Sequence, residues 1–172
     1  MDVYVTNDGV DSWEGEVRWS LETPGGEVVD SGEAAVSAKA LATTLAKDLD
    51  FAERITDENK RELVLVAELW REGERLQWAV ATFSPTKHVS LGEPNLNVEV
   101  LEAGSQLVIY LLTDSLARFV ELKLEGVDAI FSDNYFDLPA GRPVVVTCGL
   151  PEGWGVEDAR ERLRVRSVVN SF

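Results

Sequence analysis

The sequence predicts an all-β protein of two tandem β-sandwich domains, with one short helix near the C-terminus. Three observations lead to this prediction. Apolar and polar residues alternate in several stretches, strand-like runs recur about every ten residues with turn residues between them, and a single stretch has the charge order of a helix. The chain has 172 residues, enough for two domains of about 85 residues that each bury a core.

The first half begins with a predicted hairpin. Residues 16–22 alternate between apolar and polar side chains, as a half-buried strand does. Residues 23–26 then form a turn, because proline fixes φ and glycine allows positive φ, and extended structure resumes at residue 27. Residues 34–49 are richer in alanine, so a helix competes there with an irregular strand, and we favour the strand.

A second hairpin completes the first half. Residues 61–71 and 75–84 are two long strand-like runs, and the loop between them contains a glycine and is short enough for a tight turn. Pro85 ends the second run, because proline removes a backbone donor from the ladder. We therefore place the boundary near Pro85 and predict domains at residues 1–85 and 86–172.

The second half repeats the pattern with short β-rich runs. Residues 156–163 are the predicted helix, since acidic residues stand in its first turn and arginines towards its end, as the helix dipole favours. Residues 107–112 are apolar on both faces, which indicates a central strand or an interdomain contact. A closing strand is expected at residues 163–168. The β-rich runs are residues 87–91, 96–102, 106–112, 118–124, 127–131 and 142–148.

Charge and hydropathy exclude several kinds of partner. The chain has 31 acidic and 16 basic residues and a net charge of -15, which repels nucleic-acid phosphates and anionic lipid surfaces. The longest apolar run, residues 107–112, is too short to cross a bilayer, and no charged-then-apolar leader follows Met1. We expect neither a nucleic acid nor a membrane as a partner. The single cysteine forms no intrachain disulfide and leaves the compartment open.

Several segments resemble the last two domains of family 2 β-mannosidases, in the same order. The most distinctive is residues 131–141, Phe-Ser-Asp-Asn-Tyr-Phe-Asp-Leu-Pro-Ala-Gly. Residues 3–8 with 15–19 resemble the opening of the penultimate domain, residues 83–88 resemble the junction, and residues 163–167 resemble part of the terminal domain. The resemblance implies that both domains are immunoglobulin-like β-sandwiches and that the second is of the mannosidase type.

The same resemblance implies a non-catalytic role for this chain. It would be the C-terminal region of a β-mannosidase-like glycoside hydrolase, whose parent hydrolyses terminal β-D-mannosyl residues with retention. The family's acid/base and nucleophile glutamates lie in a β/α barrel, which this chain is too short and too rich in strands to contain. We therefore expect no catalytic residue and no cofactor here, and the barrel of the same parent chain as partner. A cytoplasmic parent is favoured, with a secreted one as the alternative.

Two other kinds of function stay open. An autonomous carbohydrate-binding module would take an oligosaccharide as its partner and would need exposed, coplanar aromatic side chains. A plain adhesion or spacer sandwich would bind neither sugar nor barrel. Related family 2 enzymes, such as an exo-β-glucosaminidase, carry similar tails, so the resemblance leaves the substrate of the parent open.

The residues of the distinctive motif first suggest a metal site. Asp133, Asn134 and Asp137 offer oxygen ligands, but their spacing differs from that of a calcium-binding loop and the residues between them are aromatic. We expect no metal and a structural motif instead. Asp133 and Asn134 should cap a turn through side-chain to backbone hydrogen bonds, while Tyr135 and Phe136 anchor that turn in the core.

Five tryptophans are candidates for sugar-stacking platforms. Trp19 is better explained as a core residue, Trp70 is placed to pack between the domains, and Trp78 shares its face with apolar neighbours. Trp13 and Trp154 lie in loop-like contexts and are the two candidates for contact with a ligand or with the other domain.

The remaining chemically active side chains offer no catalytic constellation. His88 is the only histidine, which excludes a dyad of histidines and a histidine-rich metal site, and we expect it at the surface or at the domain junction. Cys148 ends an apolar run and should be a small buried hydrophobe. No motif supplies the base and oxyanion site that a nucleophile would need.

Overall fold

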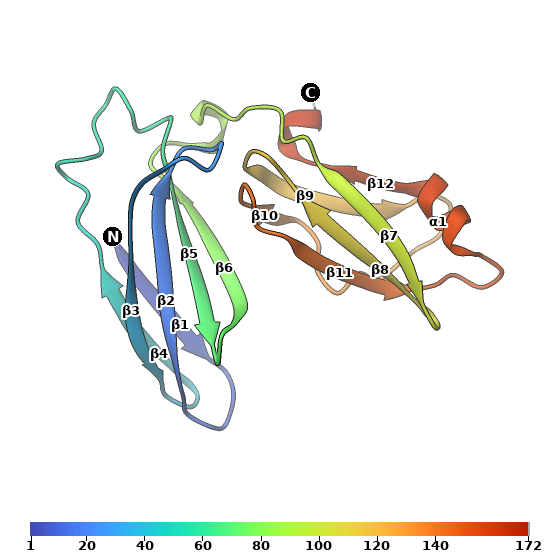
Figure 1. Ribbon diagram of the computed structural model, residues 1–172, viewed down its shortest axis with the longest axis horizontal. Coiled ribbons are helices and arrows are strands. Elements are labelled where there is room, and N and C mark those ends of the chain that lie inside the picture. Colours follow the sequence, from blue (N-terminus) through green and yellow to red (C-terminus); the bar gives the residue numbers. More distant parts are fainter. Residues whose placement is uncertain (172) are drawn as a thin grey trace. The chain divides into compact units, whose positions relative to one another are not determined.

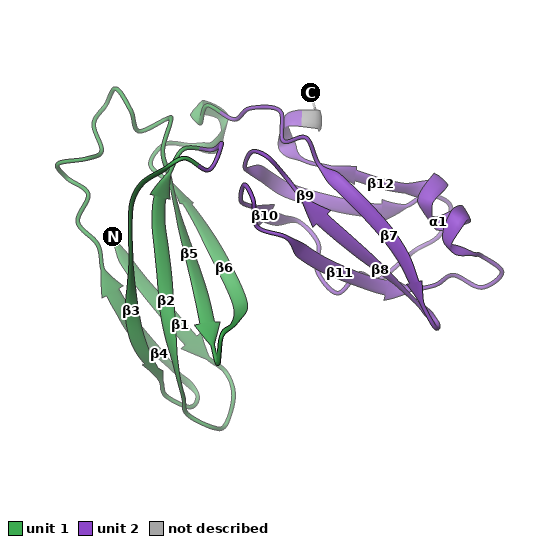
Figure 2. Ribbon diagram, in the orientation of Figure 1, with its two compact units in different colours: residues 1–23, 27–90 green, residues 24–26, 91–172 purple. Residues whose placement is uncertain are grey.

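The computed structural model describes residues 1–171 and confirms the all-β fold, with two immunoglobulin-like sandwiches and one short α-helix near the C-terminus (Figure 1). The chain forms two compact units. Unit 1 comprises residues 1–23 and 27–90, and unit 2 comprises residues 24–26 and 91–172 (Figure 2). Among the described residues, no helix has both the length and the apolar character that a membrane crossing requires.

Unit 1 is a sandwich of a two-stranded and a four-stranded sheet, and all its strand pairs are antiparallel. The smaller sheet pairs β1 (Asp2–Asn7) with β4 (Ala42–Asp48). The larger sheet has the order β3–β2–β5–β6. Its strands are β2 (Trp13–Glu22), β3 (Val28–Ala38), β5 (Val64–Arg71) and β6 (Glu74–Thr82).

Both predicted hairpins of unit 1 are confirmed. The β5–β6 turn consists of Glu72 and Gly73, with φ values of 53° and 84°, and this pair of positive angles matches the right-handed twist of a hairpin. The strand favoured for residues 34–49 over a helix is also confirmed. It is divided in two, however, because Leu41 adopts a φ of 51° in a turn between β3 and β4.

Alternation along β2 produces the core of unit 1. Val17 and Leu21 are 2% and 0% exposed, as the period-two pattern predicts for the inner face of a half-buried strand. Trp19 packs against the same core, and its ring meets the ring of Phe51 edge-on with 5.7 Å between centroids. Trp19 is therefore a core residue, as expected. Leu21 packs in a cluster with Leu49, Phe51, Leu63 and Leu65.

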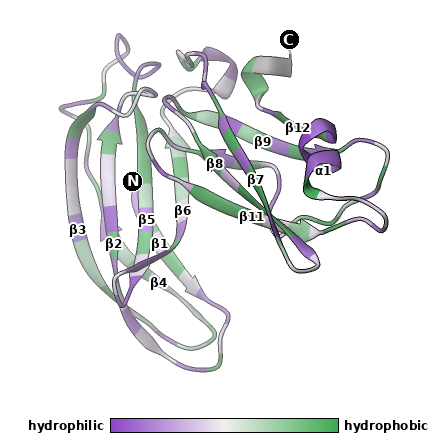
Figure 3. Ribbon diagram, turned by 45° about the vertical axis from the view of Figure 1, so that its right-hand side comes forward, coloured by the Kyte–Doolittle hydropathy of each residue, from purple (hydrophilic) through white to green (hydrophobic). Residues whose placement is uncertain are grey.

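Unit 2 is a sandwich of two three-stranded antiparallel sheets. One sheet has the order β11–β8–β7, from β7 (Asn97–Ala103), β8 (Gln106–Leu112) and β11 (Val144–Gly149). The other has the order β10–β9–β12, from β9 (Ala117–Leu124), β10 (Phe136–Leu138) and β12 (Leu163–Arg166). The predicted helix is α1 (Val156–Arg162), which is largely hydrophilic (Figure 3). Two short 3₁₀ turns complete the elements, η1 (Thr86–His88) and η2 (Val168–Ser171).

The strand predicted to be apolar on both faces is the central strand β8. Leu107, Ile109 and Leu111 on its inner face are at most 1% exposed. On its outer face, Tyr110 and Leu112 are 42% and 38% exposed. The sandwich core accounts for the apolar residues on the inner face of β8. The apolar residues Tyr110 and Leu112 on its outer face remain exposed.

Two runs predicted in the second half of the chain do not form strands. Residues 87–91 were wrong as a strand, because the chain turns at Pro85, whose carbonyl accepts the N–H of His88 at 2.8 Å. Residues 127–131 were also wrong. This stretch meets the edge strand β11 at a single bridge between Phe131 and Cys148. Beside that bridge, the N–H of Thr147 in β11 donates to the side-chain hydroxyl of Ser132 at 2.9 Å.

Candidate functional site

The distinctive motif (residues 131–141) lies along β9 and meets it at a β-bulge. The register between β10 and β9 shifts between Phe136 and Leu138, so that β9 has one residue more than β10 there. Phe119 stands in this bulge with a φ of 53°. A bulge interrupts the hydrogen-bond ladder, and the backbone groups it frees need other partners.

Asp137 provides those partners. Its Oδ1 accepts the backbone N–H of Phe119 and the Nε–H of Arg118, both at 3.1 Å, and its Oδ2 accepts from Nη2 of Arg118 at 2.9 Å. The Arg118 and Asp137 side chains are only 10% and 17% exposed. A two-point carboxylate–guanidinium pair of this kind is strong and also fixes orientation. The guanidinium of Arg118 in turn lies 5.0 Å from the centroid of the Phe119 ring.

Asn134 bonds to the backbone of β9 further along the strand, at Leu122. Its Oδ1 accepts the backbone N–H of Leu122 at 2.8 Å, and its Nδ2 donates to the Leu122 carbonyl at 2.9 Å. The amide group therefore stands in for a strand partner at this position. Asp133 Oδ1 accepts the backbone N–H of Asn134 at 2.8 Å. The side-chain to backbone hydrogen bonds expected of Asp133 and Asn134 are thus present.

Tyr135 is exposed, contrary to the expectation that it anchors the turn in the core. Its side chain is 64% exposed, because a φ of 60° turns it outward. The backbone N–H donates to Val120 at 2.7 Å, and the hydroxyl donates to Glu121 Oε1 at 3.1 Å, which raises the pKa of Tyr135. Phe136 is half-buried. Leu138 is 0% exposed, and Pro139 and Ala140 after it are also buried.

The oxygen atoms of the motif do not converge on a common point. Asp137 is engaged by Arg118 and Phe119, whereas Asp133 is exposed and bonds its neighbour. Within residues 1–171, no group of three or more histidine, cysteine, aspartate or glutamate side chains is placed to hold a metal ion.

Trp13 and Trp154 lie in different units, and each is half-buried beneath an arginine. Trp13 begins β2 and covers Gly15, where a Cβ would lie 2.8 Å from the indole ring, so glycine permits this close approach. The guanidinium of Arg71 lies 5.6 Å from the Trp13 ring centroid. Trp154 precedes α1, and the guanidinium of Arg162 lies 4.5 Å from its ring centroid.

The most exposed aromatic side chains near the motif are therefore not tryptophans. Tyr135 is 64% exposed and Phe119 is 46% exposed. Sequence reasoning missed Phe119, although the signal was present. Phe119 has the same strand parity as Glu121 and Lys123, the polar face of β9, while the residues between them are buried.

His88 and Cys148 have the expected surroundings. His88 is exposed in η1. Cys148 is 4% exposed in β11, which confirms its role as a small buried hydrophobe. Burial raises the pKa of the Cys148 thiol, so the thiol stays neutral and inert.

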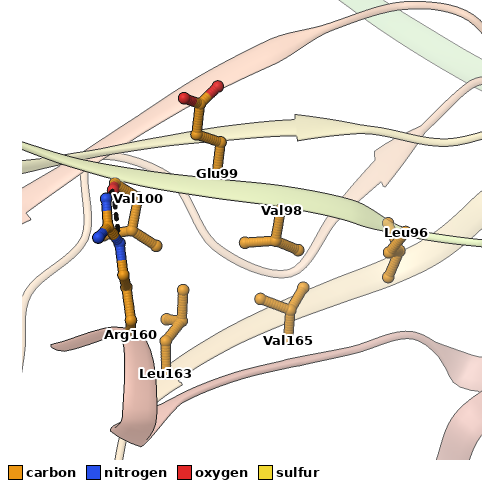
Figure 4. Close-up of a pocket in the computed structure, with 7 residues that line it drawn as sticks. All are labelled: Leu96, Val98, Glu99, Val100, Arg160, Leu163 and Val165. Atoms are coloured by element: carbon orange, nitrogen blue, oxygen red, sulfur yellow. Dashed lines mark hydrogen bonds between the residues drawn. The ribbon is translucent and has the colours of Figure 1, made fainter. Parts of the chain in front are cut away.

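Each unit has an apolar groove between the edge strands of its two sheets. The groove of unit 2 has a volume of about 610 Å³ and lies between β7 and β12 (Figure 4). Arg160 reaches from α1 to its rim, where Nε and Nη2 donate to the Val100 carbonyl at 3.1 and 2.7 Å and so cap the free edge of β7. The groove of unit 1 lies between β1 and β6 and has a volume of about 200 Å³. The lining of the unit 2 groove is Leu96, Val98, Glu99, Val100, Arg160, Leu163 and Val165.

Neither groove brings two carboxylates together. Glu99 is the one carboxylate that lines the unit 2 groove, and Glu68 is the one that lines the unit 1 groove, where it pairs with Arg75 at 3.1 Å. A third hollow of about 250 Å³ has Glu16 and Glu72 in its lining. Both of these form ion pairs with arginines next to them.

Two domain families match the chain, in tandem. Residues 1–88 match the mannosidase Ig/CBM-like domain, and residues 91–171 match an Ig-fold domain found in mannosidases. A comparison with curated proteins gave no match.

Solved structures share this fold. The chain is similar to the β-D-mannosidase of Dictyoglomus thermophilum, with a TM-score of 0.80, 19% identity, and coverage of 97% of this chain and 20% of that one. It is also similar to an exo-chitosanase of Amycolatopsis orientalis in complex with PNP-β-D-glucosamine, with a TM-score of 0.68, 13% identity, and coverage of 96% and 24%. The chain thus spans about a fifth to a quarter of the length of these proteins. The chain belongs to the mannosidase Ig/CBM-like domain family, with a mannosidase-type Ig-fold domain after it.

Proposed function

We propose that the chain is the non-catalytic C-terminal region of a β-mannosidase-like glycoside hydrolase that removes terminal β-D-mannosyl residues with retention. The observation that carries the proposal is the tandem family match, which runs through both units in the order that the resemblance implies. The fit to one fifth of a β-D-mannosidase chain supports it. The similar exo-chitosanase favours, as a second candidate, a parent that acts on β-glucosaminides.

The arrangement of acidic groups supports a role without bond cleavage. Retaining hydrolysis needs two carboxyl groups about 5 Å apart on either side of the glycosidic bond. In the three hollows described above, Glu16, Glu68 and Glu72 are each held by an arginine, and Glu99 stands without a second carboxylate in the lining. The acid/base and nucleophile of the parent would therefore come from its barrel.

An apolar patch on unit 2 supports the role of a support domain. Tyr110 and Val145 are opposite each other in the β8–β11 ladder, and Leu112 follows Tyr110 on the same face. Their exposures are 42%, 49% and 38%. Contiguous exposed apolar side chains on one face of a sheet mark an interaction surface. We assign this surface to the contact with the barrel of the same parent chain.

The experiment compares three forms of the parent hydrolase: intact, with residues 1–172 removed, and with Tyr110→Lys and Leu112→Lys together. We expect the intact form to hydrolyse an aryl β-mannoside, and both altered forms to lose activity on heating sooner, because the barrel loses its support. A parent that cleaves no β-mannoside would refute the assigned substrate. Altered forms that withstand heat as well as the intact enzyme would refute the support role.

A further inference from the structure

We infer that the outer face of the β10–β9–β12 sheet carries a binding site for a neutral pyranoside, with Phe119 and Tyr135 as its two stacking rings. The inference goes beyond the proposed function, because it concerns unit 2 alone and requires no catalytic partner. It also moves the candidate sugar contact away from Trp13 and Trp154, which are half-buried, to two aromatic side chains that are 46% and 64% exposed.

The backbone at Phe119 and Tyr135 is strained, and polar side chains stabilise the strained conformation through hydrogen bonds. Phe119 and Tyr135 have φ values of 53° and 60°, a region that costs a residue with a side chain about 1 to 2 kcal/mol. Such strain persists only where the surroundings fix it, and it concentrates at ligand-binding sites. Asp137 binds the N–H of Phe119 at 3.1 Å, and Asn134 Oδ1 accepts the N–H of Tyr135 at 3.0 Å.

Both rings are also fixed in orientation. The Phe119 ring lies on the Arg118 guanidinium, which Asp137 grips at two points. The Tyr135 hydroxyl is bonded to Glu121. A ligand that stacks on these rings would not have to order them first, and this removes part of the entropic cost of binding.

The groups around the rings fit a polyhydroxylated ligand better than a protein. Glu121 and Lys123 share the outer face of β9 with Phe119, and Arg164 lies opposite Lys123 on β12. The cores of protein–protein interfaces are depleted in lysine and glutamate. A pyranose, by contrast, has a C–H face that packs on aromatic rings and a rim of hydroxyl groups that bond to carboxylate and ammonium groups. The net charge of -15 disfavours acidic sugars. Lys123 and Arg164 beside the rings disfavour a cationic amino sugar, so we take a neutral sugar as the ligand.

The test is an amide NMR titration of the whole 172-residue chain with β-1,4-mannohexaose. We expect saturable shifts centred on residues 119–123 and 134–136, with a Kd of about 1 mM or tighter. Phe119→Gly and Tyr135→Gly should each weaken binding at least about tenfold. Both variants should fold, because glycine adopts a positive φ without strain. Tyr135→Phe keeps the ring and should keep most of the affinity.

Tyr110→Ala is the matched control, since Tyr110 is an exposed aromatic residue on the other sheet of the same unit. It should leave the titration unchanged. The inference would be overturned by the absence of shifts, by shifts centred elsewhere, or by glycine variants that bind as well as the unaltered chain. Shifts at the same amides on raising the protein concentration without sugar would overturn it too, because they would mark a protein contact. None of these outcomes bears on the hydrolytic activity of the parent.

Discussion

Asp137 grips the guanidinium of Arg118 with both carboxylate oxygens, at 3.1 and 2.9 Å, while its Oδ1 also accepts the backbone N–H of Phe119. One side chain from β10 thus bonds both the Arg118 side chain and the backbone of Phe119 in the bulge of β9. The distinctive motif, residues 131–141, therefore has a structural role: it holds β9 in place, and Phe119 and Tyr135 are exposed on the surface of unit 2.

We predict that Asp137→Ala lowers the free energy of unfolding of unit 2 by about 3 kcal/mol, because it leaves the mostly buried Arg118 without its carboxylate. Urea denaturation of the chain would measure the change. Asp133→Ala is the matched control, since that exposed carboxylate bonds only the adjacent N–H and should cost less than about 1 kcal/mol. Equal losses in the two variants would show that the Asp137 pair does not hold the bulge.

Glycine at the strained positions should stabilise the protein. Tyr135→Gly relieves a φ of 60° and should raise the free energy of unfolding by up to about 1 kcal/mol. The control Val145→Gly removes an exposed side chain from β11 and should lower it by about 1 kcal/mol, since glycine weakens a regular strand. Thermal unfolding of both variants gives the comparison. A loss of stability in Tyr135→Gly would contradict the strain that we infer.

The pKa of Tyr135 should lie above its ordinary value, because its hydroxyl donates to Glu121 and ionisation would break that bond beside a negative charge. A group whose folded pKa is raised stabilises the protein fully below the unfolded pKa. The Tyr135–Glu121 contribution should therefore persist through neutral pH and vanish as the pH rises through the folded pKa. The substitution Glu121→Gln should return the pKa of Tyr135 towards its ordinary value, as measured by an NMR titration of the tyrosine ring. An unchanged pKa would exclude Glu121 as the cause.

Cys148 should resist thiol reagents in the folded chain. Burial raises the pKa of its thiol, so little of the reactive thiolate forms at neutral pH, and the side chain is only 4% exposed. Reaction with a disulfide reagent should be slow in buffer and fast in urea. The linked stability is present below the unfolded pKa and is lost as the pH rises through the folded one. Rapid labelling of the folded chain would show that β11 opens at Cys148.

The sequence predicts most of the strands, because a strand with one face in a core alternates with period two. β2 and the β5–β6 hairpin follow directly from that rule and from the residues of their turns. Residues 127–131 have the same apolar character but form no strand. They meet β11 at one bridge, and the side chain of Ser132 accepts an N–H of β11 beside it. No local pattern contains that information.

The candidate site was less predictable for a related reason. Asp133 accepts the N–H of Asn134, and Asn134 accepts the N–H of Tyr135, so these local bonds could be expected from the residue types. The bonds of Asn134 to Leu122 join it to β9 and could not. Tyr135 donates its backbone N–H to Val120 of β9, and Asp137 pairs with Arg118 of β9, so both involve a different part of the chain. Long-range partners of this kind appear only once the register of two strands is known.

We propose that this chain supports hydrolysis without performing it, and turnover of an aryl β-mannoside by the purified 172-residue chain tests this proposal. We predict that product release stays at the level of buffer alone. The contrary result would be activity that co-purifies with the chain through successive columns and that Glu16→Gln or Glu72→Gln abolishes. Such activity would place an active site within these two sandwiches.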